Sequence, residues 1–478
     1  MIALTLGEIA RITDGQVVDG VDTAGSASAG ADLVVDGPVV TDSRDAAAGS
    51  LYVARIGEAM DGHQFVEAAR AQGAVAALTS RPVADLPCVV VQDVQAALVL
   101  LARALVERND HAVVIAITGS SGKTSTKDLL SSVLARYGET VANVGSLNSE
   151  VGVPLTACRI TATTAYLVLE MGTRAIGQIT YLTRIAPPQI GVVLNVGTAH
   201  VGEFGSREAI GTAKAELVQA LPATGFAVLN ADDPIVSGMA SQTRAHVIQV
   251  GESIGANVRA TDISLDLQGR ASFTLVTGQG SASVALGFHG GHHVGNALAV
   301  AAVALAVGMP LQDVATALGD ARPLSRWRME VHERADGVTI VNDAYNANPD
   351  SMRAALKALS VMGQGRRTWA VLGEMRELGS ESIAEHDLIG RLAVRLKVSR
   401  LVAVGQGTQP IDSGARHEGS WGEESIWVRD TDAAYDLLRQ QLAPGDVVLL
   451  KSSRDAGLRW LGDRLLDNTD DSLSEAPS

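Results

Sequence analysis

The chain has 478 residues, 46% of them hydrophobic, and carries a formal net charge of -15 at pH 7. This length predicts two to four domains with sizeable cores, and the acidic balance argues against a broad nucleic-acid-binding surface. The two cysteines, Cys88 and Cys158, lie far apart in the sequence, which argues against a disulfide framework and fits a reducing compartment. The N-terminus lacks a basic region, and the longest apolar run, 297–307, is too short to span a bilayer. We therefore expect a cytoplasmic location and no membrane insertion. A monomer is also expected, although none of these features determines the oligomeric state.

Residues 1–90 contain short apolar segments between Gly and Asp turns, which predict a small mixed α/β domain. From 91 to 322 helical and strand patterns alternate, as is typical of a doubly wound parallel sheet. The elements expected there are helices at 93–107, 124–136 and 294–307, strands at 111–118, 166–170, 190–196 and 226–230, and a β-rich stretch at 246–288.

A third unit is expected over 323–478, where strand and helix patterns again alternate as in a Rossmann-like fold. Its expected strands are 337–342, 369–373, 400–404 and 446–450, and its expected helices are 350–361, 381–396 and 431–442. The polar tail from 467 to 478 is expected to be disordered. The chain as a whole is thus predicted to be an α/β protein of three domains.

The strongest local signal is TGSSGKTS, residues 118–125, which follows a strand and opens a helix. That context is typical of a phosphate-binding loop in an ATPase-type domain, where backbone N–H groups and the helix N-terminus face phosphate oxygens. Lys123 would neutralise the β- and γ-phosphates, and the Thr124 hydroxyl would ligate Mg²⁺. Ile117 stands where the usual spacing has its first glycine, so the loop is a shortened variant. The residues expected around the phosphates are Gly119, Ser120, Ser121, Gly122, Lys123, Thr124 and Ser125.

Two polar residues follow later strands of the same unit. Glu170 ends the strand at 166–170, and His200 follows the strand at 190–196. Because strand C-termini of a parallel sheet share one edge, both could meet the bound phosphates and a metal ion. The residues alone leave two alternatives open, a helix cap for Glu170 and an ordinary turn residue for His200. Lys214, in the helical pattern GTAKAELVQAL, is by itself most simply a solvated lysine.

The motifs occur in an order that resembles the Mur ligase family over nearly the whole chain. They are TGSSGKTS, LNSEVGVPLT, EMGTRAIGQI, NVGTAHVGEFGS, AKAEL, GHHVGNALA and NDAYNANPDSM. The last of these, with LGEMRELGSES, is similar to the family members that add D-alanyl-D-alanine. The early segment TDSRDAAAGSLYVARIGEAMDGHQF resembles the family's UDP-binding domain.

The resemblance implies three domains: 1–90 for the UDP end of the substrate, 91–322 for ATP and 323–478 for ligation. It also implies an ATP- and Mg²⁺-dependent amide ligase that joins D-alanyl-D-alanine to a UDP-linked muramyl tripeptide through an acyl phosphate. The third residue of that tripeptide, lysine or a diaminopimelate, stays open. The implied partners are these small molecules only, and the implied pathway is synthesis of the cell-wall precursor.

Site residues follow from the resemblance position by position. The implied metal ligands are Thr124, Glu170, His200 and, if carbamylated, Lys214. Carbamylation would turn the lysine from a cation into a carboxylate-like ligand. Asn296 would contact adenine, Asp343 the ribose and Arg328 the γ-phosphate. The implied catalytic residues are Lys123, Lys214, Arg328 and His200.

The implied substrate-binding residues come from three segments of the chain. They are Ser43, Arg44, Asn148, Tyr345, Asn346, Asn348, Ser351, Lys451 and Arg454. Without the resemblance, NANPDS is a turn with a helix N-cap. Departures from the family pattern occur at Gly291 and His293, near the adenine-contacting Asn296, and at Ser452, where glycine is common.

Three other functions compete with this one. A folate polyglutamate ligase of the same superfamily would not be expected to carry the N-terminal DSR…DGHQF module, which is present here. A family member that adds the third amino acid would carry a D-N-P-R tetrad or a relative of it after Pro323, and none is present. A regulatory nucleotide-binding protein would keep the phosphate loop but could lose the metal and ribose groups, whereas Glu170, His200, Lys214 and Asp343 are all in place. Dependence of ATP consumption on both co-substrates would discriminate between these functions.

Overall fold

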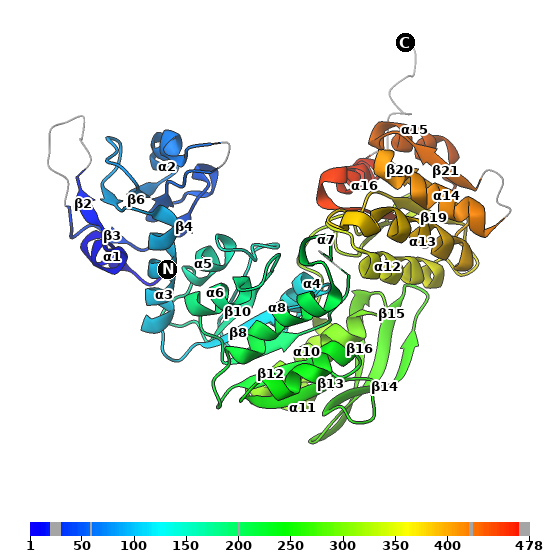
Figure 1. Ribbon diagram of the computed structural model, residues 1–478, viewed down its shortest axis with the longest axis horizontal. Coiled ribbons are helices and arrows are strands. Elements are labelled where there is room, and N and C mark those ends of the chain that lie inside the picture. Colours follow the sequence, from blue (N-terminus) through cyan, green and yellow to red (C-terminus); the bar gives the residue numbers. More distant parts are fainter. Residues whose placement is uncertain (20–29, 58–59, 199–200, 420–423, 468–478) are drawn as a thin grey trace, which may run out of the picture.

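The computed structural model describes residues 1–19, 30–57, 60–198, 201–419 and 424–467. They form three α/β units along the chain, with the N-terminal and C-terminal units at opposite ends of a central one (Figure 1). The α/β fold with three units is the one predicted. Of the tail expected to be disordered, 467–478, the first residue ends a helix, and residues 468–478 lie outside the described residues. Among the described residues, no helix is both long and apolar enough to cross a membrane.

The N-terminal unit is built on a five-stranded sheet of order β2-β7-β6-β5-β4. Only the β2–β7 pair is antiparallel. The strands are β2 (Gln16–Val18), β4 (Val39–Val40), β5 (Ser50–Val53), β6 (Ala74–Thr79) and β7 (Cys88–Val90), with a separate pair β1 (Leu4–Thr5) and β3 (Val34–Val35). Its helices are α1 (Leu6–Thr13) and α2 (Val66–Ala71). Helix α3 (Val94–Arg108) begins after Asp93, whose carboxylate caps the N–H groups of Gln95 and Ala96, and leads into the central unit.

The central unit has a nine-stranded sheet of order β16-β15-β14-β13-β12-β11-β8-β10-β9. It is parallel except for the pairs that β15 makes with β14 and β16. The strands are β8 (Val113–Thr118), β9 (Thr140–Ala142), β10 (Tyr166–Glu170), β11 (Ile190–Val193), β12 (Phe226–Asn230), β13 (His246–Gly251), β14 (Val258–Leu265), β15 (Arg270–Thr277) and β16 (Gly280–His289).

Helices cover both faces of the central sheet, so β8, β10 and β11 are buried runs of apolar residues. One apolar core contains residues of α4 (Lys123–Leu134), α10 (His293–Ala306) and α11 (Leu311–Asp320). The other contains residues of α5 (Gly152–Ala157), α6 (Gln178–Ile185), α8 (Arg207–Gln219) and α9 (Pro234–Gly238). Strand β8 is an interior strand between β11 and β10, and it delivers its loop to the carboxyl edge of the parallel strands, where ligands bind in such folds.

The C-terminal unit has a six-stranded sheet of order β17-β18-β22-β19-β20-β21, parallel except for β17–β18. The strands are β17 (Glu330–Glu333), β18 (Thr339–Asn342), β19 (Thr368–Leu372), β20 (Arg400–Val404), β21 (Ser425–Val428) and β22 (Val447–Lys451). Helices α12 (Pro349–Met362), α13 (Ser382–Arg395) and α14 (Gln409–Glu418) share one core, and α15 (Thr431–Gln441) and α16 (Leu458–Asp467) share another. Strands β17 and β21 and helices α14 and α16 were not anticipated.

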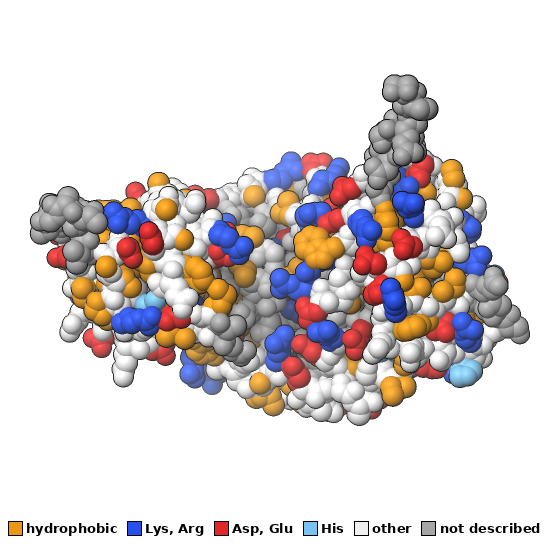
Figure 2. All heavy atoms as spheres, turned by 90° about the horizontal axis from the view of Figure 1, so that it is seen from above, with side chains coloured by type: hydrophobic (Ala, Val, Ile, Leu, Met, Phe, Trp, Pro, Cys, Tyr) orange, Lys and Arg blue, Asp and Glu red, His pale blue; other side chains and the backbone are white. Residues whose placement is uncertain are grey.

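Acidic and basic side chains are interspersed over the face of the molecule in Figure 2. The net negative charge therefore does not gather into one acidic field on that face. The arrangement suits a protein whose charge-dependent binding is local rather than spread over a broad surface.

Candidate active site

The loop between β8 and α4 has the backbone of a phosphate-binding loop. Gly122, at the helix start, has φ of +81°, and a Cβ atom there would lie 2.8 Å from Asn296 Oδ1. Any other residue at this position would be both strained and crowded. The N–H of Ser120 donates to Asn195 O at 3.0 Å, and that of Ser121 donates to Asn195 Oδ1 at 2.9 Å. Asn195 was missed in the sequence, although a polar residue directly after a buried strand was the available signal.

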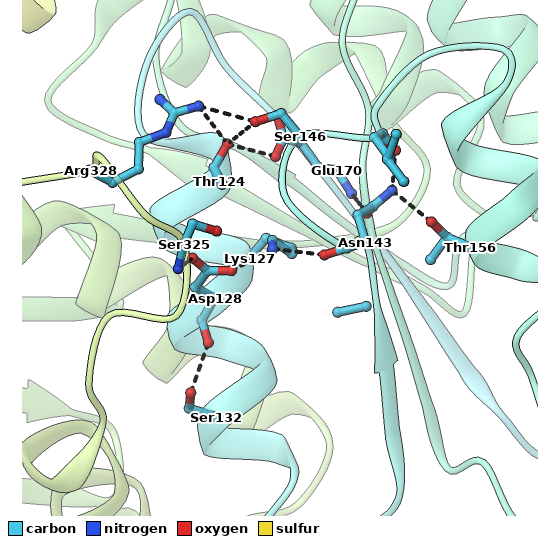
Figure 3. A network of polar contacts seen from close by, with 12 residues as sticks. Thr124, Lys127, Asp128, Ser132, Asn143, Ser146, Thr156, Glu170, Ser325 and Arg328 are labelled. Atoms are coloured by element: carbon cyan, nitrogen blue, oxygen red, sulfur yellow. Dashed lines mark hydrogen bonds and ion pairs between the residues drawn. The ribbon is translucent and has the colours of Figure 1, made fainter. Parts of the chain in front are cut away.

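Glu170 faces this loop and caps no helix, which settles the alternative left open by the sequence. Its carboxylate accepts from Thr124 Oγ1 at 2.9 Å and from Asn148 Nδ2 at 2.6 Å, and the residue is 1% exposed. Ser146 Oγ lies 3.1 Å from Thr124 Oγ1 and joins the same cluster, seen in Figure 3. Ser146, in the loop after β9, was not predicted from the sequence. The cluster presents hydroxyl and carboxylate oxygens, the ligand types that Mg²⁺ prefers.

Two lysines line the cavity beside the cluster. Lys123 Nζ donates to the carbonyl of Gly119 at 2.7 Å. Lys214 is 3% exposed, so the solvated-lysine alternative is wrong: its helix turns this side chain inward, towards the ends of the strands. Burial lowers the pKa of the Lys214 amine well below its ordinary range, and the nearby charge of Lys123 lowers it further. Burial also lowers the pKa of Lys123, which Glu170 opposes.

The C-terminal unit adds a cation to the same cluster. Arg328 Nη2 donates to Thr124 Oγ1 at 3.2 Å and to Ser146 Oγ at 3.1 Å, and Figure 3 shows this approach. The guanidinium carbon lies 4.3 Å from the centre of the Tyr345 ring, within cation–π range. Arg328 Nε is buried and has no hydrogen-bond partner among the described residues. A buried charged donor of this kind is expected to meet an acceptor on a ligand.

A second charged pair lies on the C-terminal side of the cavity. Lys451 Nζ donates to Asp343 Oδ2 at 2.6 Å and to the carbonyl of Asn346 at 3.1 Å. Burial lowers the pKa of Lys451, and the Asp343 carboxylate opposes the shift. Ser452 is buried and does not have a positive φ, so the departure from glycine leaves this loop unstrained.

The NANPDS segment both caps a helix and lines the cavity. Asn348 Oδ1 accepts from the N–H of Ser351 at 2.9 Å, and Ser351 Oγ accepts from the N–H of Asn348 at 3.0 Å. This capping box starts α12 and confirms the local alternative from the sequence. Asn348 Nδ2 also donates to the carbonyl of Ser120 at 3.3 Å, so the cap lies against the phosphate loop.

A cavity of about 900 Å³ joins these groups between the central and C-terminal units. Most of the residues singled out in the sequence line it: Ser120, Ser121, Gly122, Lys123, Thr124, Ser125, Asn148, Glu170, Lys214, Asn296, Arg328, Asp343, Tyr345, Asn346, Asn348, Ser351 and Lys451. Gly119 adjoins it through its carbonyl, and His200 lies outside the described residues. Within an acidic protein, the lysines and arginines of this lining make a local site for phosphates.

Asn296 and His293 both line the cavity. Asn296 Nδ2 lies 3.3 Å from His293 Nδ1, and the His293 ring lies 5.1 Å from that of Phe288. Burial lowers the pKa of His293 well below its ordinary range, with smaller contributions from His292 and His289. The described residues contain no group of three or more His, Cys, Asp or Glu side chains able to hold a metal.

Three of the expected substrate residues lie apart from the cavity lining. Ser43 and Arg44 belong to a short 3-10 helix of the N-terminal unit, and the Arg44 side chain, 86% exposed, pairs with Asp42 at 2.5 Å. Hydrogen bonds from Arg44 lower the pKa of the Asp42 carboxyl to about 2. Arg454 is not part of the lining either, although its guanidinium carbon lies 6.0 Å from the centre of the Tyr345 ring, which is.

Known proteins similar to this chain match it over nearly its whole length. The model of the Mur ligase middle domain matches residues 117–304, that of the Mur ligase glutamate ligase domain matches 327–454, and that of the Mur ligase family catalytic domain matches 38–109. The UDP-N-acetylmuramoyl-tripeptide--D-alanyl-D-alanine ligase of Mycobacterium bovis is 48% identical, over 98% of each chain. The ligase of the same name from Escherichia coli is 34% identical, over 98% of this chain and 99% of the relative.

Solved structures give the same result. MurF from Acinetobacter baumannii superposes with a TM-score of 0.84 at 33% identity, covering 98% of this chain and 99% of that one. The MurF ligase of Thermotoga maritima in complex with ADP has a TM-score of 0.77 at 27% identity, covering 91% of this chain and 98% of that one. Matches of this extent, together with the three domain models, show that this chain belongs to the Mur ligase family.

Proposed function

We propose that this chain is the ATP-dependent amide ligase that joins D-alanyl-D-alanine to UDP-N-acetylmuramoyl-tripeptide, forming the pentapeptide precursor, ADP and phosphate. The observation that carries the proposal is the meeting of Arg328, from the C-terminal unit, with Thr124 and the buried Glu170 of the central unit. Full-length similarity to ligases that bear this substrate in their names supports the choice among amide ligases. A regulatory protein would not need a cavity whose cations come from two units.

ATP is proposed to lie along the cavity with its phosphates on the loop at 119–125. Lys123 and Arg328 then contact the β- and γ-phosphates, Asn296 the adenine and Asp343 the ribose. The buried Nε of Arg328 supports this assignment, because a phosphate oxygen would satisfy it. The carbonyl of Gly119 holds Lys123 Nζ at 2.7 Å, so the ammonium is already at the loop before phosphate arrives.

Mg²⁺ fits the oxygen cluster beside the loop. Thr124 Oγ1 and the Glu170 carboxylate are hard oxygen donors, and the small number of protein ligands is typical of Mg²⁺ bound with nucleotide phosphates. His200 and carbamylated Lys214 are proposed as further ligands. The ion would supply positive charge against the phosphate oxygens.

Carbamylation of Lys214 requires the neutral amine, whose nitrogen adds to the carbon of CO₂ and releases a proton. The depressed pKa of this buried amine supports that reaction at ordinary pH. Exclusion of solvent would then protect the carbamate. The same burial would make an unmodified, charged lysine costly at this position.

The reaction is proposed to have two stages. An oxygen of the tripeptide's terminal carboxylate attacks the γ-phosphorus, the bond to the ADP oxygen breaks, and an acyl phosphate forms. The amine of D-alanyl-D-alanine then attacks the acyl carbon, loses a proton, and displaces phosphate to leave an amide. Lys123 and Arg328 reduce the repulsion between carboxylate and triphosphate in the first stage. Closure of the C-terminal unit would keep water from the acyl phosphate.

The substrate is proposed to span all three units. Residues 1–90 would bind the UDP end, with Ser43 and Arg44 at the diphosphate, because the planar guanidinium suits paired phosphate oxygens. Residues 91–322 would hold ATP, and 323–478 would bring Tyr345, Asn346, Asn348, Ser351, Lys451 and Arg454 to the peptide end, beside Asn148 of the central unit. The chain is proposed to act as a monomer. Two free, buried cysteines support a cytoplasmic location.

The test is phosphate release from ATP and Mg²⁺ with UDP-muramyl tripeptide and D-alanyl-D-alanine, omitting each in turn. We expect release only with all four, and a product heavier than the tripeptide by one dipeptide residue. Release with UDP-muramyl dipeptide and a single amino acid, in place of the tripeptide and D-alanyl-D-alanine, would instead identify a third-residue ligase. ATP binding without turnover on either substrate would identify a regulatory protein. Tripeptides ending in lysine and in diaminopimelate, compared by kcat/KM, would identify the third residue.

A further inference from the structure

The backbone on both sides of Arg328 has an unusual conformation. Trp327 has φ of +59° and Met329 has φ of +52°, and neither is glycine. Residues with a Cβ rarely adopt the left-handed region, and such a conformation persists only where its surroundings hold it. Contacts around Trp327 and Met329 must therefore stabilise the backbone on which Arg328 stands.

Trp327 is held at its backbone and at its ring. Its N–H donates to Glu330 Oε2 at 2.8 Å, and its indole Nε1 donates to the two carboxylate oxygens of Asp463 at 3.1 and 3.2 Å. Asp463 lies in α16, at the end of the chain, and its side chain is only 20% exposed. The Trp327 ring also packs edge-on against Trp460, one turn earlier in α16, with 5.0 Å between ring centres.

On the other side of Arg328, the N–H of Met329 donates to Asp343 Oδ1 at 3.1 Å. All of these partners belong to the C-terminal unit, whereas the acceptors for the Arg328 guanidinium, Thr124 and Ser146, belong to the central unit. The C-terminal unit thus carries Arg328 on a backbone that is fixed from within that unit. The side chain is aimed before it meets the phosphate loop.

We propose that Trp327 and Asp463 are positioning residues for the γ-phosphate end of the ATP site. The Asp463 carboxylate accepts hydrogen bonds from the indole N–H and so holds the Trp327 side chain. The held side chain stabilises the left-handed backbone at Trp327, and this backbone directs Arg328 towards Thr124. The proposal rests on the proposed function, because it takes the terminal phosphate of ATP to lie beside Arg328. A simpler role for Asp463 exists, since it also pairs with Arg326 at 3.1 Å.

Variants distinguish the positioning role of Asp463, through Trp327, from its ion pair with Arg326. Trp327→Phe keeps an aromatic ring against Trp460 but removes the indole N–H, and Asp463→Leu removes the acceptor at similar volume. We expect each to lower kcat by about tenfold, because small misplacement of a phosphate-binding group is costly. We also expect each to weaken ATP binding while ADP binding, measured by titration calorimetry, stays within about twofold of the wild type. A double variant should resemble the single ones, since both act through one contact.

Two control variants sharpen the result. Asp463→Asn keeps an acceptor for the indole and should recover most of kcat. Arg326→Gln removes the exposed ion pair, and should leave kcat and the ATP-to-ADP affinity ratio close to the wild type. Thermal melting of every variant shows whether folding is affected.

The proposal is overturned if Asp463→Leu has wild-type kcat and an unchanged affinity ratio, or if Arg326→Gln reproduces its defect. Should Asp463→Leu melt early, Trp327→Phe decides alone: a lower Tm with an unchanged affinity ratio would make the contact merely structural. If the wild type binds ATP but does not turn over its three substrates, the proposed function fails, whereas the affinity ratio still tests the positioning role.

Discussion

The N-terminal and C-terminal units join the central unit in opposite ways. One apolar core runs without interruption from Leu6 and Leu78 of the N-terminal unit, through Leu101 of α3, to Leu167 and Leu217 of the central unit. The two cores of the C-terminal unit contain only its own residues. The two end units lie at opposite ends of the central unit in Figure 1, but only the N-terminal unit shares an apolar core with it.

The C-terminal unit meets the central one through polar contacts. Besides Arg328, they include the N–H of Ser325 donating to Asp128 Oδ2 at 3.0 Å and the N–H of Thr198 donating to Asp350 Oδ2 at 3.2 Å. Apolar burial binds two units in proportion to area, whereas partly hydrated polar contacts are individually weak and reversible. We infer that the first two units move together and that the third docks on them, completing the site when it does.

The largest expected effect is on the half of the site that the fused units hold by themselves. Lys123→Ala removes the ammonium beside the phosphate loop and should lower kcat by about a thousandfold. It should leave docking of the C-terminal unit intact, because Lys123 contacts Gly119 within the central unit. Stopped-flow measurement of phosphate release gives kcat. Small-angle X-ray scattering with and without ATP shows whether the C-terminal unit still docks. A variant that retains wild-type kcat would exclude Lys123 from the reaction.

The sequence predicted the parts of the molecule that depend on local pattern. The strand expected at 111–118 is found at 113–118, and the strand at 166–170 is found as expected, because apolar runs are local signals. The turn expected at the phosphate loop is likewise marked by its glycine spacing. Strand β17 was missed because its residues, Glu330 to Glu333, are half-buried or exposed and include no apolar alternation of useful length. It exists because it pairs with β18 at the sheet edge.

Residues of the candidate site could be predicted where they belong to a sequence motif. They could not be predicted where only tertiary packing brings them to the site. Ser146 meets Thr124 only because β9 and β8 both flank β10, an order that no local pattern reveals. The inward orientation of Lys214 likewise depends on how α8 lies on the sheet. The hydrogen bond from the Trp327 indole to Asp463 joins residues 136 positions apart, so no local pattern predicts it. The structure brings most of the predicted site residues to one cavity, but the ligand role of each of them stays a prediction. Ser43, Arg44 and Arg454 are not among the lining residues, and His200 lies outside the described residues.

The second expected effect tests the shared core. Leu101→Ala in α3 and Leu449→Ala in β22 both truncate a fully buried leucine, and each should cost roughly 2–5 kcal/mol of unfolding free energy. Hydrogen exchange read by mass spectrometry should show faster exchange in both the N-terminal and central units for the first variant. The second variant should affect only peptides within 330–467. If both variants raised exchange equally in all three units, the N-terminal and central units would not form a cooperative pair separate from the C-terminal unit.

A smaller effect concerns pH. The folded state lowers the pKa of Lys214 by burial, so protonation favours the unfolded chain at pH values between the folded pKa and about 10.4. Unfolding free energy therefore rises with pH through that interval, and Lys214→Met should remove this dependence. In CO₂-free buffer at pH 7 we expect Lys214→Met to be more stable than the wild type by roughly 1–3 kcal/mol, although inactive. Urea unfolding at pH 7 and 9 should show the difference narrowing as pH rises; a constant difference would mean that the amine does not titrate in this range.

The smallest effect belongs to a single docking contact. Arg174 of the central unit pairs with Glu377 of the C-terminal unit at 3.1 Å, and its side chain is 66% exposed. Exposed pairs contribute about 0–1 kcal/mol and are screened by salt, so Arg174→Gln should raise KM for ATP by no more than about fivefold. The wild type and the variant should converge as salt is raised to about 1 M, where the Debye length is about 3 Å. Arg103→Gln, which breaks an exposed ion pair inside α3, is the matched control and should leave KM unchanged at every salt concentration. If Arg174→Gln also leaves KM unchanged at low salt, docking depends on the buried contacts around Thr124 and Ser120 rather than on charge at the rim.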